Sequence, residues 1–172
     1  NNNNNNNTKI KTAKKLVDTW LLGVVNQGLP NLALLKEIHA TGFDMSCIVT
    51  TRGLRMNVDS DTFLAFILFY VSDMVSDRRY DAVGISKFFI RAEALKAVLF
   101  LVDEAKVDLD KAAMLSPLMC ACTNSFLGVA AGRYLLLKGA NFDVQSHNGS
   151  TALHYAVFSG NVEMTKLLIL AG

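Results

Sequence analysis

Internal repetition is the feature that most restricts the fold of this 172-residue sequence. Residues 133–139, Arg-Tyr-Leu-Leu-Leu-Lys-Gly, are followed 33 positions later by Lys-Leu-Leu-Ile-Leu-Ala-Gly at 166–172. Ser-Pro-Leu-Met-Cys-Ala at 116–121 is followed 35 positions later by Thr-Ala-Leu-His-Tyr-Ala at 151–156. Self-similarity at a period of roughly 20–50 residues is typical of stacked repeat architectures. The sequence therefore predicts short helical units that bury their apolar faces against one another.

The composition is that of a folded chain. Hydrophobic residues make up 51% and charged residues 19% of it, and a chain this apolar buries enough surface to fold. The formal net charge of +2 does not suggest a nucleic-acid partner, because such proteins gather basic residues on one face. Four lysines near the N-terminus are interpreted as a solvated helix start, with a weak membrane or RNA contact as the alternative. They are Lys9, Lys11, Lys14 and Lys15.

The repeat resembles the ankyrin repeat, a unit of about 33 residues with a turn and two short helices. Four segments carry the resemblance: Gly139–Asp143, Asn148–His154, Gly160–Glu163 and Lys166–Leu168. They look like the start of a hairpin, its tip with the next first helix, the turn into a second helix, and that helix's packed face. The resemblance implies an all-α solenoid of stacked helix-turn-helix units with hairpin loops, and atypical N-terminal repeats or a helical cap.

Local residue types agree with this assignment. Pro117 suits the first position of a helix, and Thr151 is a suitable N-cap. Gly139 and Gly160 follow apolar runs and suit left-handed helix ends. Six leucines are predicted to fill the core between units, and replacing Leu153 with alanine is expected to cost about 2–5 kcal/mol. These leucines are Leu118, Leu135, Leu136, Leu153, Leu167 and Leu168.

The repeat pattern weakens before residue 112, and three regions are expected. Residues 1–10 are a low-complexity polyasparagine segment predicted to be disordered. Residues 11–111 are either degenerate ankyrin repeats or an unrelated helical capping region. Residues 112–172 are ankyrin repeats, truncated at the C-terminal end. Because the sequence begins without methionine and ends after an apolar stretch, we expect it to be a fragment of a longer protein.

Helices are also expected in the weaker region. Thr62–Val71 and Ala94–Ala105 are predicted to form one helix pair, separated by a long insert over Ser72–Arg91. Thr19–Gly28 and Leu32–Ile38 faintly repeat the pattern. The most apolar run, within the first of these helices, is too short for a membrane span of about 20 residues. We therefore expect no membrane insertion.

No catalytic, cofactor-binding or metal-ligating pattern is present. The sequence lacks the nucleophile-elbow, phosphate-loop and zinc-protease motifs, so no enzyme activity, cofactor or small-molecule substrate is predicted. The resemblance implies a structural role for His154, through hydrogen bonds between neighbouring turns. Cys47, Cys120 and Cys122 lack zinc-site spacing. We interpret them as buried reduced thiols and expect a cytoplasmic location, with the nucleus as the alternative.

The resemblance implies a scaffold that binds a protein partner of unidentified sequence on a concave face of hairpin tips and first helices. The matching candidate residues are Ala112, Ala113, Leu115, Thr123, Asn124, His147, Asn148, Ser150, Phe158 and Ser159. For Phe158, packing against a further repeat is the alternative. For the whole chain, the alternatives are the recognition arm of a larger enzyme (a kinase, ubiquitin ligase or GTPase regulator) and a structural domain without a ligand.

Overall fold

The computed structural model describes residues 2–27, 30–46, 48–49, 61–76, 86–112, 114–123 and 127–172. Within these ranges the chain is almost entirely helical. The helices are α1 (Asn2–Gln27), α2 (Leu32–Ala40), α3 (Phe63–Ser76), α4 (Lys87–Asp103), α5 (Pro117–Thr123), α6 (Gly128–Leu137), α7 (Ala152–Phe158) and α8 (Val162–Ala171). Two short strands, β1 (Ile48–Val49) and β2 (Asp61–Thr62), pair antiparallel with Ile48 opposite Thr62.

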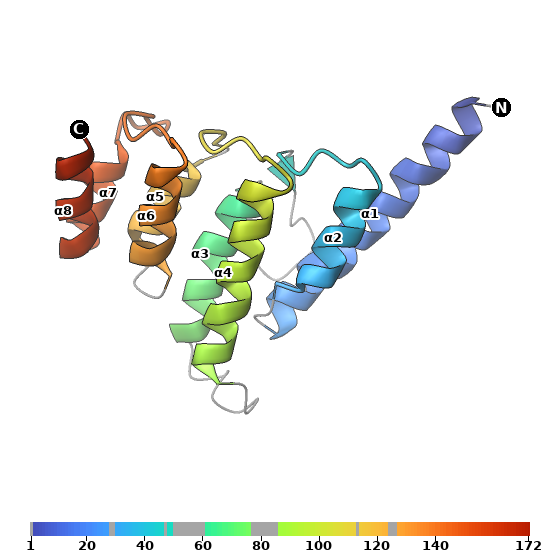
Figure 1. Cartoon of the computed structure of the whole chain (residues 1–172), viewed down its shortest axis with the longest axis horizontal. Helices are drawn as coiled ribbons and strands as arrows, with labels where there is room; N and C mark the ends of the chain where they lie inside the picture. Colours follow the sequence, from blue (N-terminus) through green and yellow to red (C-terminus); the bar gives the residue numbers. More distant parts are fainter. Residues whose placement is uncertain are drawn as a thin grey trace.

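The helices form four consecutive pairs that stack side by side along one axis (Figure 1). Each of α1, α3, α5 and α7 packs on the helix that follows it in the chain. Between pairs, α3 contacts α5, α5 contacts α7, α2 contacts α4, and α6 contacts α8. The connections from α4 to α5 and from α6 to α7 lie on the same side of the stack. The predicted all-α solenoid is confirmed.

One hydrophobic core runs through the stack. It extends from Val17 in α1 to Leu168 in α8. At the N-terminal end Trp20 lies against two rings of α3, with centroid distances of 5.1 Å to Phe63 and 5.9 Å to Phe66. Each pair therefore shares its apolar surface with its neighbours, as repeat proteins do.

The same turn closes three of the helix pairs. The side chains of Asp44, Asp108 and Asn141 each accept a hydrogen bond, at 2.9 Å, from the backbone N–H two residues later. Two positions before each of them stands a residue in the left-handed conformation: Gly42 (φ 79°), Lys106 (φ 52°) and Gly139 (φ 89°). The turn after α2 thus matches the turn after α6, which favours degenerate repeats over an unrelated cap for residues 11–111.

Hydrogen bonds join each of these turns to the next one. The Asp108 N–H donates to the Ser46 hydroxyl at 2.9 Å, although the two residues are 62 positions apart. The Asn141 N–H donates to the Asp110 carboxylate at 2.8 Å across 31 positions. These bonds fix the spacing of successive pairs on the side of the stack that carries the connections.

Lys106→Gly is expected to raise the free energy of unfolding by about 0.5–1 kcal/mol. A left-handed non-glycine residue costs roughly 1–2 kcal/mol, and the extra freedom of glycine in the unfolded chain offsets roughly 0.5–1 of that gain. Urea denaturation of both proteins measures the difference. Lys111→Gly is the control, because Lys111 has no positive φ, and it should destabilise the chain. Equal effects at the two positions would contradict the assigned turn.

The last two pairs confirm several local predictions. Pro117 is the first residue of α5 and Thr151 is the N-cap of α7. Gly139 and Gly160 have φ of 89° and 66°, as the left-handed helix ends require. Among the six core leucines, Leu118, Leu135 and Leu168 are buried, and Leu136 and Leu167 are half-buried.

Leu153 differs from its prediction, because 38% of it is exposed. It lies on the last helix pair, where no further pair covers it within the described residues. The expected cost of Leu153→Ala is therefore too high for this chain.

Two helix boundaries also differ from the predictions. Helix α1 begins at Asn2, so residues 2–10 are helical where disorder was expected. A helix that is already nucleated extends by one hydrogen bond per residue, and no glycine or proline precedes Gly23. Helix α4 begins at Lys87 within the predicted insert, because the Ser86 hydroxyl caps it by accepting the Phe88 N–H at 3.3 Å. The loop expected over 77–81 lies outside the described residues.

Candidate functional site

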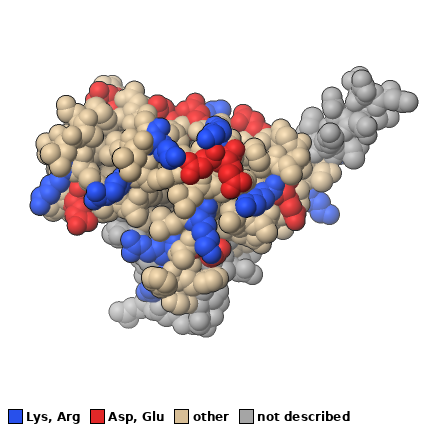
Figure 2. Space-filling model, in the orientation of Figure 1, with Lys and Arg blue, Asp and Glu red and all other residues tan. Residues whose placement is uncertain are grey.

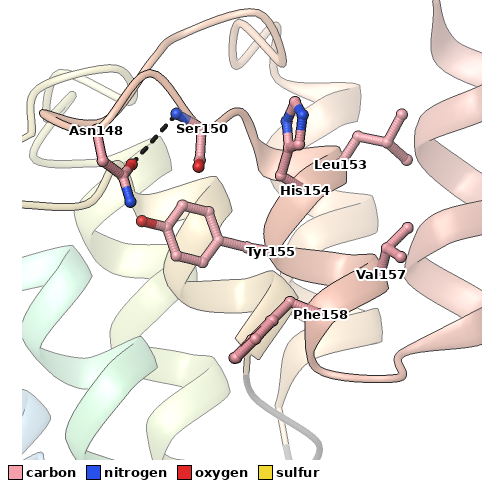
Figure 3. Close-up of a pocket in the computed structure, with 7 residues that line it drawn as sticks. All are labelled: Asn148, Ser150, Leu153, His154, Tyr155, Val157 and Phe158. Atoms are coloured by element: carbon pink, nitrogen blue, oxygen red, sulfur yellow. Dashed lines mark hydrogen bonds between the residues drawn. The ribbon is translucent and has the colours of Figure 1, made fainter.

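A groove of about 630 Å³ opens at the C-terminal end of the stack, between the α6–α7 connection and α7 (Figure 3). The connection contributes polar groups and α7 contributes apolar and aromatic side chains. The lining residues are Asn148, Ser150, Leu153, His154, Tyr155, Val157 and Phe158. None of these seven is aspartate, glutamate, lysine or arginine, so the groove is an uncharged and mainly apolar surface.

A tight hairpin holds the polar edge of the groove. The Ser146 N–H donates to the Ser150 carbonyl at 2.9 Å, and the Gly149 N–H donates to the Ser146 carbonyl at 2.8 Å. Gly149 has φ of 78°, a conformation that glycine adopts without strain. The Asn148 side-chain oxygen accepts from the Ser150 N–H at 3.2 Å and from the Ser146 hydroxyl at 2.5 Å. The tip is therefore rigid without any contribution from a ligand.

His154 fixes the start of α7. Its Nδ1 accepts the backbone N–H of the N-cap residue Thr151 at 3.2 Å and lies 3.0 Å from the Thr151 hydroxyl. This contact is the reciprocal half of a capping box, in which the third helical residue reaches back to the N-cap. The hydrogen bonding of His154 is thus structural. It acts within its own turn.

Helix α7 presents different chemistry on its two sides. Leu153 and Val157, four residues apart, lie on one side, and Tyr155 points to the other side with its hydroxyl toward Asn148 (Figure 3). That hydroxyl donates to the Ser146 hydroxyl oxygen at 3.3 Å and so braces the hairpin. Phe158 ends the helix and is 91% exposed. Such a large, free aromatic ring beside an apolar groove requires an explanation.

Charged side chains lie elsewhere. On the face shown in Figure 2, acidic and basic residues are interspersed, without a continuous basic area. Helices α4 and α6 are joined there by Asp103, which accepts from the Tyr134 hydroxyl and pairs with the Lys138 ammonium at 2.7 Å. The Lys138 and Tyr134 hydrogen bonds lower the pKa of the Asp103 carboxyl below its ordinary value. This cluster stabilises the contact between units and leaves the groove uncharged.

The groove brings together three of the ten predicted partner-binding residues: Asn148, Ser150 and Phe158. His147 and Ser159 are exposed nearby in the chain, at the hairpin tip and at the end of α7. Ala112, Leu115 and Thr123 are half-buried in or next to the preceding unit. Ala113 and Asn124 lie outside the described residues.

The other four lining residues were not predicted as binding residues. Leu153 was assigned to the core and His154 to structure, whereas Tyr155 and Val157 received no individual assignment. The available signal was the helical spacing, because positions 153, 154, 157 and 158 share one face of a helix. Which part of that face is exposed depends on what covers α7, and the sequence pattern does not show this.

The described residues contain no group of three His, Cys, Asp or Glu side chains that could hold a metal ion. Among them, no helix is long and apolar enough to cross a membrane. Cys120 and Cys122 are buried free thiols of α5, and burial raises the pKa of Cys122 to about 12. Because a thiolate is the reactive form, Cys122 has a packing role, and Cys47 lies outside the described residues.

Comparison with known proteins supports the repeat assignment. Residues 88–172 match the family model for ankyrin repeats in three copies. The chain is an ankyrin-repeat protein. It is also 42% identical over 52 residues to the ankyrin repeat protein L92 of Acanthamoeba polyphaga mimivirus, a match that covers 30% of this chain and 12% of that protein. The chain thus matches only a small part of its relative's length, and the ankyrin family model begins at the start of α4.

Proposed function

We propose that this ankyrin-repeat chain is a protein-interaction module that binds its partner through the α6–α7 hairpin tip and the groove beside α7. The observation that carries the proposal is Phe158, which is 91% exposed at the edge of an uncharged groove of about 630 Å³. Ankyrin repeats are generally protein-interaction modules without catalytic activity, which supports a non-enzymatic role.

The physical properties of the groove suit a protein partner. Buried aromatic anchors carry much of the energy of protein interfaces, and Phe158 can become buried only when another surface covers it. The hairpin is held by its own hydrogen bonds, so binding requires little ordering of this edge. Because no lining residue carries a formal charge, an apolar segment of the partner fits best, and its affinity should depend only weakly on salt.

A location in a reducing compartment, such as the cytoplasm, is part of the same proposal. Cys120 and Cys122 are buried and unpaired, and disulfides are rare in the cytosol.

Phe158→Ala is expected to weaken partner binding at least about tenfold, the loss typical of removing an interface anchor. The measurement is quantitative affinity capture from cell extract, followed by titration of each captured protein against the purified variants. Phe88→Ala is the matched control, because Phe88 is also a phenylalanine, 80% exposed, at the start of α4. Equal partner profiles and affinities for the wild-type protein and the Phe158 variant would contradict the proposal.

A further inference from the structure

The third and fourth helix pairs show what an apolar end face of this stack binds. Helix α7 packs on α5 and α8 packs on α6, so the pair α5/α6 is covered by the pair α7/α8. Position for position, Leu153 of α7 corresponds to Leu118 of α5, and Val157 corresponds to Cys122. Leu118 is 1% exposed and Cys122 0%, whereas Leu153 is 38% and Val157 61% exposed. The side of α7 that is open is therefore equivalent to a side of α5 that is closed.

The second helices show the same difference. Leu136 of α6 is half-buried, and its counterpart 33 positions later, Ile169 of α8, is exposed. By contrast, Leu137 and its counterpart Leu170 are both strongly exposed. Leu137 stays exposed even though α8 covers α6, so Leu170 does not belong to the contact. The equivalent surface is thus confined to Leu153, Val157 and Ile169, which we call the end face.

The existing contact also has a polar part. The side-chain amide of Asn161, the N-cap of α8, donates to the Cys122 carbonyl at 3.3 Å. The corresponding carbonyl on the end face belongs to Val157, which accepts the Gly160 N–H at 3.0 Å and retains a second lone pair. A partner for the end face therefore needs two packed helices and an amide donor at the start of the second one.

We infer that the end face is a stacking surface for one further helix pair of the α7/α8 type, which continues the solenoid. Such a pair carries the shape and the donor that this face lacks, since α7/α8 itself satisfies the equivalent surface of α5/α6. An apolar peptide would bury the leucine and valine side chains, but it would not supply the amide donor from a second helix.

This inference divides the groove into two parts. Leu153 and Val157 become buried under the added pair, as Leu118 and Cys122 are. The counterpart of Phe158 is Thr123, which stays half-exposed although α7 packs on α5. Phe158 is therefore expected to stay accessible at the edge of the added pair. The inference does not depend on the proposed partner binding, because the two rest on different residues of α7.

The test supplies the missing pair from the protein itself. A second copy of residues 140–172, one full unit of 33 residues, is appended after Gly172, and thermal unfolding is followed by circular dichroism. The extended protein should unfold in one transition with a higher Tm. Leu153→Ala should lower the Tm of the extended protein by about 5 °C or more, and that of the 172-residue chain by much less.

Two matched variants separate stacking from other effects. Leu170→Ala should change neither Tm by more than about 1 °C, as expected for a surface substitution. Phe158→Ala should leave the rise in Tm on extension intact, so loss of partner binding and loss of stacking are read independently. Separate melting of the added unit, or an unchanged effect of Leu153→Ala, would overturn the inference. So would dimers of the 172-residue chain, seen in sedimentation, that Leu153→Arg dissociates, because a second copy would then occupy the face.

Discussion

Leu118→Ala is expected to lower the free energy of unfolding by about 2–5 kcal/mol, and Leu153→Ala by about 1 kcal/mol or less. The two leucines occupy the same position of consecutive repeats, 35 residues apart. Leu118 is 1% exposed beneath α7, whereas Leu153 is 38% exposed. Removing a buried leucine side chain loses its transfer free energy and leaves a cavity, whereas water fills the space at an exposed site. Urea denaturation monitored by circular dichroism measures both differences.

The conservative pair Leu118→Met and Leu153→Met is the control. Methionine nearly conserves the volume of leucine, so each change should cost less than about 1.5 kcal/mol. A large loss for Leu118→Ala with a small loss for Leu118→Met would identify the cavity as the cause. Equal losses for the two alanine variants would show that Leu153 is as well covered as Leu118, and the structure of the last repeat would then be wrong.

The contrast between these two leucines also shows what the sequence can predict. The repeat pattern identified Leu153 as a stacking residue, because position in the unit determines which way a side chain points. It did not identify the residue as exposed, because burial depends on the neighbouring unit and not on the residue itself. Similarly, the weak pattern upstream of residue 112 gave little warning of the turn at Asp44, which matches the later turns closely. That turn is held by a side chain and backbone conformation that several residue types can adopt.

The candidate site was predicted in part for the same reason. The hairpin tip was found because Asn148-Gly149 is a turn dipeptide, and such turns project from the stack. Phe158 was found because its position belongs to the exposed side of a first helix. The apolar floor, formed by Leu153 and Val157, was missed because those positions are core positions in a repeat that has a successor. Sequence reasoning assigns positions to faces, but the extent of an open surface is a property of the whole stack.

Gly128→Ala is expected to destabilise the chain by about 3 kcal/mol, the upper part of the range for overpacking a tight contact. Gly128 is the first residue of α6, and a Cβ atom there would overlap the carbonyl oxygen of Ala121 in α5. It would also lie 3.5 Å from the Asn161 side-chain nitrogen, the group that donates to the Cys122 carbonyl. The substitution therefore strains the α5/α6 pair and crowds the polar contact with the next unit.

Gly23→Ala in α1 is the matched control for this prediction. A Cβ atom at Gly23 meets nothing within 4 Å, so alanine should stabilise the helix by about 0.5–1 kcal/mol through the reduced entropy of the unfolded chain. The same substitution thus has opposite signs at two helical glycines, and urea denaturation distinguishes them. A neutral or stabilising Gly128→Ala would mean that α5 and α6 do not approach as closely as described. It would also remove the reason why this repeat has glycine at the position where the next repeat has Asn161.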